Sequence, residues 1–128
     1  MKLETLVENF FTAGKKAANS KDRDELHTFR IAAKRLRYTI ELLDPKGGND
    51  WLRRLRVVQE QLGNMNDAFV AEQFLRALPS RSIQARPLPA QLHAEALTHI
   101  AAFQKTWLRR FGLRTEKAWL SWARELET

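Results

Sequence analysis

The chain of 128 residues contains no cysteine, which excludes disulfides, thiolate metal sites and cysteine nucleophiles. Long apolar runs are also missing, since none approaches the ~20 residues that span a bilayer. Glu4 and Glu8 interrupt the apolar stretch at the N-terminus, where a signal peptide would need an unbroken core. We therefore expect a cytoplasmic protein that has no membrane partner.

Glycine and proline are scarce, with five and four residues, and most of them fall near 45–48 and 79–89. Between these two places apolar residues recur with the 3.6-residue period of a helix, and no alternating strand pattern occurs. The pattern predicts an all-α protein that forms one domain over residues 1–128. Four long helices joined by short connections favour an antiparallel four-helix bundle. Their expected ranges are about 2–18, 22–43, 50–78 and 90 to nearly the C-terminus.

Two glycines fall inside the expected helices. Gly63 lies in the middle of the third helix, where it costs roughly 1 kcal/mol relative to alanine. We expect a kink or a close contact with another helix at Gly63, and a bend at Gly112 in the fourth helix.

Acidic residues are in deficit: 22 lysines and arginines face 15 aspartates and glutamates, which gives a formal charge of +7. A polyanion is the partner that such an excess favours. The alternative is that the charge only keeps the protein in solution.

The second helix carries a stripe of basic residues. At 100° per residue, His27, Arg30, Lys34 and Arg37 lie within about 80° of one another. Like charges one turn apart repel by a few tenths of a kcal/mol, and the nearest acid on the stripe is Glu41. The stripe therefore indicates an anion-binding site, in which His27 is a candidate pH-dependent member. The alternative is a solvated face whose long stems cover apolar surface.

The third helix has a comparable flank, with Arg53 and Arg56 near its start and Glu60 and Asp67 further along. If the two flanks face each other, the cations line a groove. In that arrangement the two acids hold some of the cations in place through charge-assisted hydrogen bonds.

The segment LHTFRIAAKRLRYTIELL at 26–43, followed by LRRLRVVQEQLGNMNDAFV at 52–70, resembles the CHAD family of helical domains. The matching features are a His-x-x-Arg-x-x-x-Lys-Arg-Leu-Arg-Tyr run at 27–38 and a Gln-x-x-x-Gly-x-x-x-Asp run at 59–67. The resemblance implies a protein that binds inorganic polyphosphate along a basic groove and associates with polyphosphate granules. It implies these binding residues, of which Arg53 is the weakest match: His27, Arg30, Lys34, Arg35, Arg37, Tyr38, Arg53 and Arg56.

A full CHAD domain resembles two related four-helix halves with the groove between them, whereas this chain has the length and motifs of one half. Either the chain is a fragment, or two copies meet to rebuild the groove, and we expect a homodimer. A row of amides at steps of seven in the third helix predicts a clamp between helices or an interface. It consists of Gln59, Asn66 and Gln73.

Two other functions share some of these features. A nucleic-acid binder would have the same charge, but the sequence has no helix-turn-helix spacing, no Gly-rich basic arm and no aromatic residue among the cations except Tyr38. An enzyme acting on phosphate esters or anhydrides would need paired carboxylates, and Glu60 with Asp67 is the one pair at helical spacing. His93 and His99 do not complete a metal site with His27. We therefore expect no enzyme activity, no cofactor and no metal.

Overall fold

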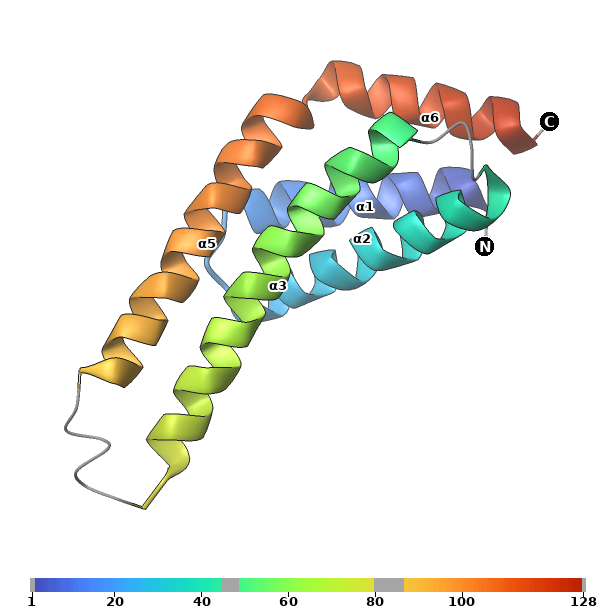
Figure 1. Cartoon of the computed structure of the whole chain (residues 1–128). Helices are drawn as coiled ribbons and strands as arrows, with labels where there is room; N and C mark the ends of the chain where they lie inside the picture. Colours follow the sequence, from blue (N-terminus) through green and yellow to red (C-terminus); the bar gives the residue numbers. More distant parts are fainter. Residues whose placement is uncertain (1, 45–48, 80–86, 128) are drawn as a thin grey trace.

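The computed structural model describes residues 2–44, 49–79 and 87–127, and these ranges are all-helical (Figure 1). The first three helices confirm the predicted ranges closely. Pro45, Gly47, Gly48 and residues 80–86 of the predicted turns lie outside the described ranges, but the helix ends on either side match the predicted breaks. The helices are α1 (Leu3–Ala18), α2 (Arg23–Leu43), α3 (Asn49–Ala77), α5 (Leu88–Arg110) and α6 (Leu113–Glu127).

The predicted single C-terminal helix is two helices, because the chain leaves the helical conformation at Phe111, beside Gly112, where a bend was expected. Its φ of -124° and ψ of 47° end α5, while its N–H still donates to the carbonyl of Trp107. The Phe111 ring is 3% exposed, and its centroid lies 5.1 Å from that of Trp107 and 5.6 Å from that of Trp119. The break lets this ring enter the core, and the described residues form five helices instead of four.

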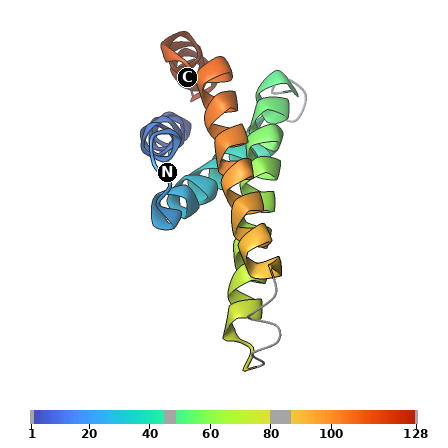
Figure 2. The ribbon, with the colours of Figure 1, turned by 90° about the vertical axis from the view of Figure 1, so that its left-hand side faces the viewer.

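The arrangement also differs from the predicted antiparallel bundle. In Figures 1 and 2, α3 and α5 form a long antiparallel pair, and α1 and α6 cross one end of it. Figure 2 views α1 nearly along its axis while α3 and α5 run down the page. The far ends of α3 and α5 consequently project beyond the other helices.

An aromatic cluster joins the crossing helices. The Phe10 ring of α1 lies 5.1 Å from Phe29 of α2, 5.7 Å from Trp107 of α5 and 5.7 Å from Trp119 of α6, measured between centroids. Burying one such ring stabilises the fold by about 1.5–3 kcal/mol, and each aromatic pair adds about 0.5–1.5 kcal/mol. Phe10 therefore attaches α1 to three other helices at once.

Most residues of the 3.6-residue apolar period form the core. The apolar stripe of α1 is buried, as are Leu36 and Ile40 of α2 and Leu55 of α3. The same period includes Leu43, Val70 and Leu113, but these side chains are 54%, 52% and 65% exposed. Leu43 and Leu113 stand at helix ends, and Val70 lies near the level at which α2 begins, so no helix covers these three side chains.

Polar side chains join α3 to α5. Gln61 Nε2 donates to Thr106 Oγ1 at 2.8 Å. Nearer the projecting end, Glu72 accepts from Arg76 Nε at 2.7 Å and lies 3.0 Å from His93 Nδ1. Burial alone would raise the pKa of Glu72, but the hydrogen bonds and charges of His93 and Arg76 outweigh it and lower that pKa. The carboxylate therefore stays ionised between its two partners.

The clamp between helices that was predicted for the row of amides is wrong, whereas the alternative, an interface, stays a prediction. Within the described ranges, Gln59, Asn66 and Gln73 donate no hydrogen bond to another helix, and Gln61 makes that bond instead. Helix α3 runs through Gly63 without a break, and a Cβ added there would meet no atom within 4 Å. The close helix contact predicted at Gly63 is therefore also absent. Among the described helices, none has the length and apolar character needed to cross a membrane.

Gly14 is the glycine at which two helices meet closely. It is buried on α1, and a Cβ on it would overlap the indole ring of Trp107, which is 5% exposed. Phe11 and Phe29 flank this ring at 5.7 Å and 5.5 Å between centroids, so it has little room to move.

We predict that Gly14→Ala lowers the free energy of unfolding by about 1–2 kcal/mol, because overpacking outweighs the gain in helix propensity. The matched control Gly63→Ala should raise it by up to about 1 kcal/mol, because that site is open. Urea unfolding followed by circular dichroism measures both. Equal stabilisation by the two substitutions would contradict the contact between α1 and Trp107.

Candidate functional site

Helix α2 presents its basic stripe toward α3 because its apolar face is fixed in the core. Asp22 caps the helix by accepting a hydrogen bond from the N–H of Asp24 at 3.3 Å. Leu26, Phe29 and Leu36 are fully buried on one face. The positions about 80–100° from that face then fall on the side where α2 meets α3.

A hollow of about 590 Å³ lies between the N-terminal half of α2 and the middle of α3. It contains two of the predicted residues, His27 and Arg30, and we call it the α2–α3 groove. Two aspartates at the start of α2 reduce its positive charge. The groove is lined by Lys21, Asp22, Arg23, Asp24, His27, Arg30, Met65 and Asn66.

Arg30 and Arg37 each hold a buried Nε–H group that has no hydrogen-bond acceptor among the described residues. Arg37 Nε lies 3.7 Å from Glu41 Oε1, which is close enough for an ion pair but too long for a hydrogen bond. Leaving a buried donor unpaired costs about 1–3 kcal/mol. An anion that accepts from these two groups would remove that cost.

The remaining cations of the stripe have their charged groups available. In the part of the chain that the structure describes, neither His27 nor Lys34 makes a hydrogen bond or an ion pair, and the same holds for Arg56. His27 and Arg56 are exposed, and Lys34 is half-buried. Tyr38 is 51% exposed, and the guanidinium of Arg37 lies 4.8 Å from its ring centroid.

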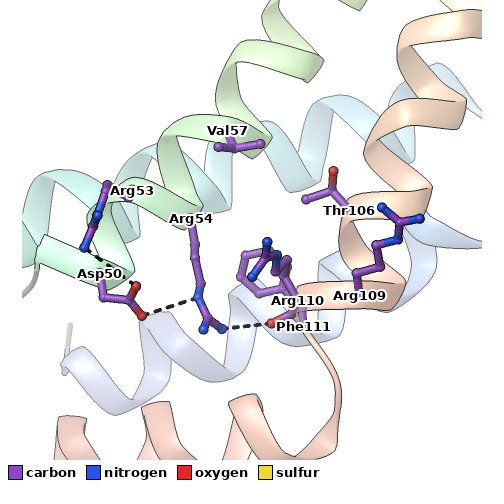
Figure 3. Close-up of a pocket in the computed structure, with 8 residues that line it drawn as sticks. All are labelled: Asp50, Arg53, Arg54, Val57, Thr106, Arg109, Arg110 and Phe111. Carbon is purple, nitrogen blue, oxygen red and sulfur yellow. Dashed lines mark hydrogen bonds and ion pairs between the residues drawn. The ribbon is translucent and has the colours of Figure 1, made fainter.

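Eight predicted residues do not line this groove: Lys34, Arg37, Tyr38 and Arg56, described above, and the four that follow. Arg35 points to the other flank of α2 and lines a hollow against α1, because it lies 100° from Lys34 on the helix. Arg53 lines a separate pocket between α3 and α5 (Figure 3). Glu60 and Asp67 are exposed and form no ion pair within the described ranges, so the predicted support of the cations by these acids is absent.

Sequence reasoning missed Lys21 and Arg23 at the mouth of the groove. The guanidinium of Arg23 lies 4.4 Å from the ring centroid of Phe69, which links α2 to α3 by a cation–π contact. Arg23 precedes His27 by one helical turn, so extending the stripe one turn toward the N-terminus would have found it. Across the described part of the chain, no three His, Asp or Glu side chains gather as metal ligands.

A family model of the CHAD domain matches residues 1–76, which is more than half of the chain. The chain belongs to the CHAD family. No curated protein and no solved structure matches it. The match confirms the resemblance seen in the two motifs, and it contains α1, α2 and almost all of α3.

CHAD domains are associated with polyphosphate binding. Both walls of the α2–α3 groove lie inside the matched region, so the basic stripe belongs to the part of the chain that defines the family. Helices α5 and α6 lie beyond the match.

Proposed function

We propose that this CHAD protein binds inorganic polyphosphate along the α2–α3 groove and the basic stripe that continues from it. The observation that carries the proposal is that the buried Nε–H groups of Arg30 and Arg37, on one flank of α2, have no hydrogen-bond acceptor among the described residues. A protein that served only its own stability would pair or expose such donors. Their position two turns apart, with Lys34 between them, suits a ligand that carries a negative charge at every repeat.

The residues have distinct roles in this proposal. The planar guanidinium groups of Arg30 and Arg37 each offer a fork to two phosphate oxygens, whereas Lys34 acts as a point charge. Their half-buried stems are already held by packing, so little side-chain entropy is lost on binding. Arg56 on α3 and Tyr38 on α2 support the bound chain, and His27 lines the groove beside Arg30.

Binding is favoured over catalysis and over nucleic-acid recognition. The carboxylates that an enzyme would need, Glu60 and Asp67, are exposed and form no ion pair with a cation among the described residues. The two half-buried guanidinium groups, Arg30 in the groove and Arg37 further along the stripe, suit a thin single chain better than the wide surface of a duplex. We further propose a cytoplasmic protein that associates with polyphosphate granules through this groove and uses no cofactor.

We predict that Lys34→Gln and Arg30→Gln each weaken binding of long-chain polyphosphate by about tenfold or more, the equivalent of one charge-assisted contact. The matched control Lys16→Gln removes the same charge from the opposite flank, beside Arg35, and should change the affinity less than about threefold. Isothermal titration calorimetry at one fixed salt concentration measures all three. Equal losses would mean that the stripe is only part of a diffuse positive field.

We also propose that the working unit is a homodimer whose two grooves face each other. A single groove is open on one side, where water and salt screen each contact, whereas two facing grooves would enclose the polymer. Val70 and Phe74 on α3 are 52% and 65% exposed and lie one turn apart. Phe74 follows Arg56 by about five turns, so it lies on the same side of α3, and a second copy could cover it.

We predict that light scattering gives a dimer mass at moderate salt, and that lowering the salt shifts the mass toward the monomer because two +7 chains repel each other. Polyphosphate should restore the dimer. Phe74→Gln should weaken it, whereas Leu108→Gln, which changes an 80% exposed side chain on α5, should not. A monomer under every condition that still binds long polymers tightly would show that one groove is enough.

A further inference from the structure

A second cationic pocket lies between the start of α3 and the end of α5, away from the α2–α3 groove. Its volume is about 370 Å³, within the range of roughly 300–1,000 Å³ that is typical of small-molecule sites. Figure 3 shows arginines on both walls, with the Val57 and Thr106 side chains between them. The pocket is lined by Asp50, Arg53, Arg54, Val57, Thr106, Arg109, Arg110 and Phe111.

The charges in this pocket are not balanced. Four arginines face one aspartate, which leaves an excess of three positive charges. Asp50 serves the two arginines of α3, at 3.4 Å from Arg54 Nε and 4.0 Å from Arg53 Nη2. Within the described ranges, Arg109 and Arg110 have no ion pair at their guanidinium groups.

The end of α5 accounts for only part of this excess. A helix C-terminus carries about half a negative charge, and basic residues in the last turn interact with it favourably. The carbonyl of Arg110 also accepts from Arg54 Nη1 at 3.2 Å, which fixes one guanidinium across the two helices. At least two of the four positive charges remain without a counterpart in the pocket.

Thr106 adds a directed donor to the same wall. Its Oγ1 already accepts from Gln61 Nε2 at 2.8 Å, and its hydroxyl proton has no acceptor among the described residues. The hydrogen bond from Gln61, which does not itself line the pocket, holds the Thr106 hydroxyl at the pocket wall and leaves its proton available to a ligand.

We propose that this pocket is a second anion site, for two or three linked phosphoryl groups. In Figure 3 Arg53 and Arg109 lie on opposite sides of the pocket with Arg54 and Arg110 between them, so a linked oligophosphate could reach both walls, whereas a single phosphate could contact one. The negative carboxylate of Asp50 at one end of the pocket repels any further phosphate group. The ligand is therefore a short oligophosphate or the end of a longer chain, and the site does not depend on the α2–α3 groove.

The test is calorimetric titration of the full chain with tripolyphosphate. The double substitution Arg109→Gln with Arg110→Gln should weaken binding about tenfold or more. The matched double substitution Lys105→Gln with Arg114→Gln removes the same charge from exposed positions outside the pocket and should cost less than about threefold. Thr106→Val should weaken binding by about two- to tenfold. Helicity and the unfolding midpoint verify that each variant folds.

Equal losses in the two double variants would overturn the proposal, and so would unchanged binding by Arg109→Gln with Arg110→Gln. Long-chain polyphosphate then separates the two ligand sources. If the pocket takes chain ends, the pocket variant weakens long-chain binding as well; if it takes only free oligophosphates, long-chain binding is unchanged. Lys34→Gln provides the independent arm, because Lys34 belongs to the basic stripe and does not line this pocket. If Lys34→Gln leaves long-chain binding unchanged, the proposed function fails while the tripolyphosphate result still stands, and the reverse also holds.

Discussion

The packing of aromatic rings around Phe10 and Trp107 is the interaction on which the rest of the structure depends. These rings attach α1 and α2 across one end of the α3–α5 pair. The absence of a side chain at Gly14 lets the Trp107 ring pack directly on α1. Because α2 is held in this position, its basic flank meets α3 and a groove forms between them.

The cationic residues of the groove and the stripe make an unfavourable electrostatic contribution to the free energy of folding. Like charges stand one turn apart along α2, and the Nε–H groups of Arg30 and Arg37 are buried without acceptors among the described residues. Each effect is small beside the aromatic core, which contributes several kcal/mol. The core can therefore hold an unfavourable cationic surface in place, and a polyanion would convert that surface into a favourable one.

The sequence predicted the first three helices and the side of α2 that carries the cations, because apolar period and helical angle are local properties. For the last helix it predicted only a bend at Gly112 and not the end of α5 at Phe111, since the apolar period continues across that residue, whose ring packs on Trp107 in the core. The motif also predicted Arg35 as a binding residue, because Arg35 is adjacent to Lys34 in the chain. On the helix it lies 100° away from Lys34 and faces α1. The contact of Arg54 with the carbonyl of Arg110 joins residues 56 apart, and no local pattern indicates it.

The central claim is that the α2–α3 groove is built for a thin phosphate chain and not for polyanions in general. The most direct measurement compares the affinities of long-chain polyphosphate and duplex DNA, at equal phosphate concentration and over a range of salt. Both affinities should fall with salt, because both ligands release counterions. Our account predicts that polyphosphate binds at least about tenfold more tightly throughout, a difference of one charge-assisted contact. Equal affinities, or tighter binding of DNA, would contradict it.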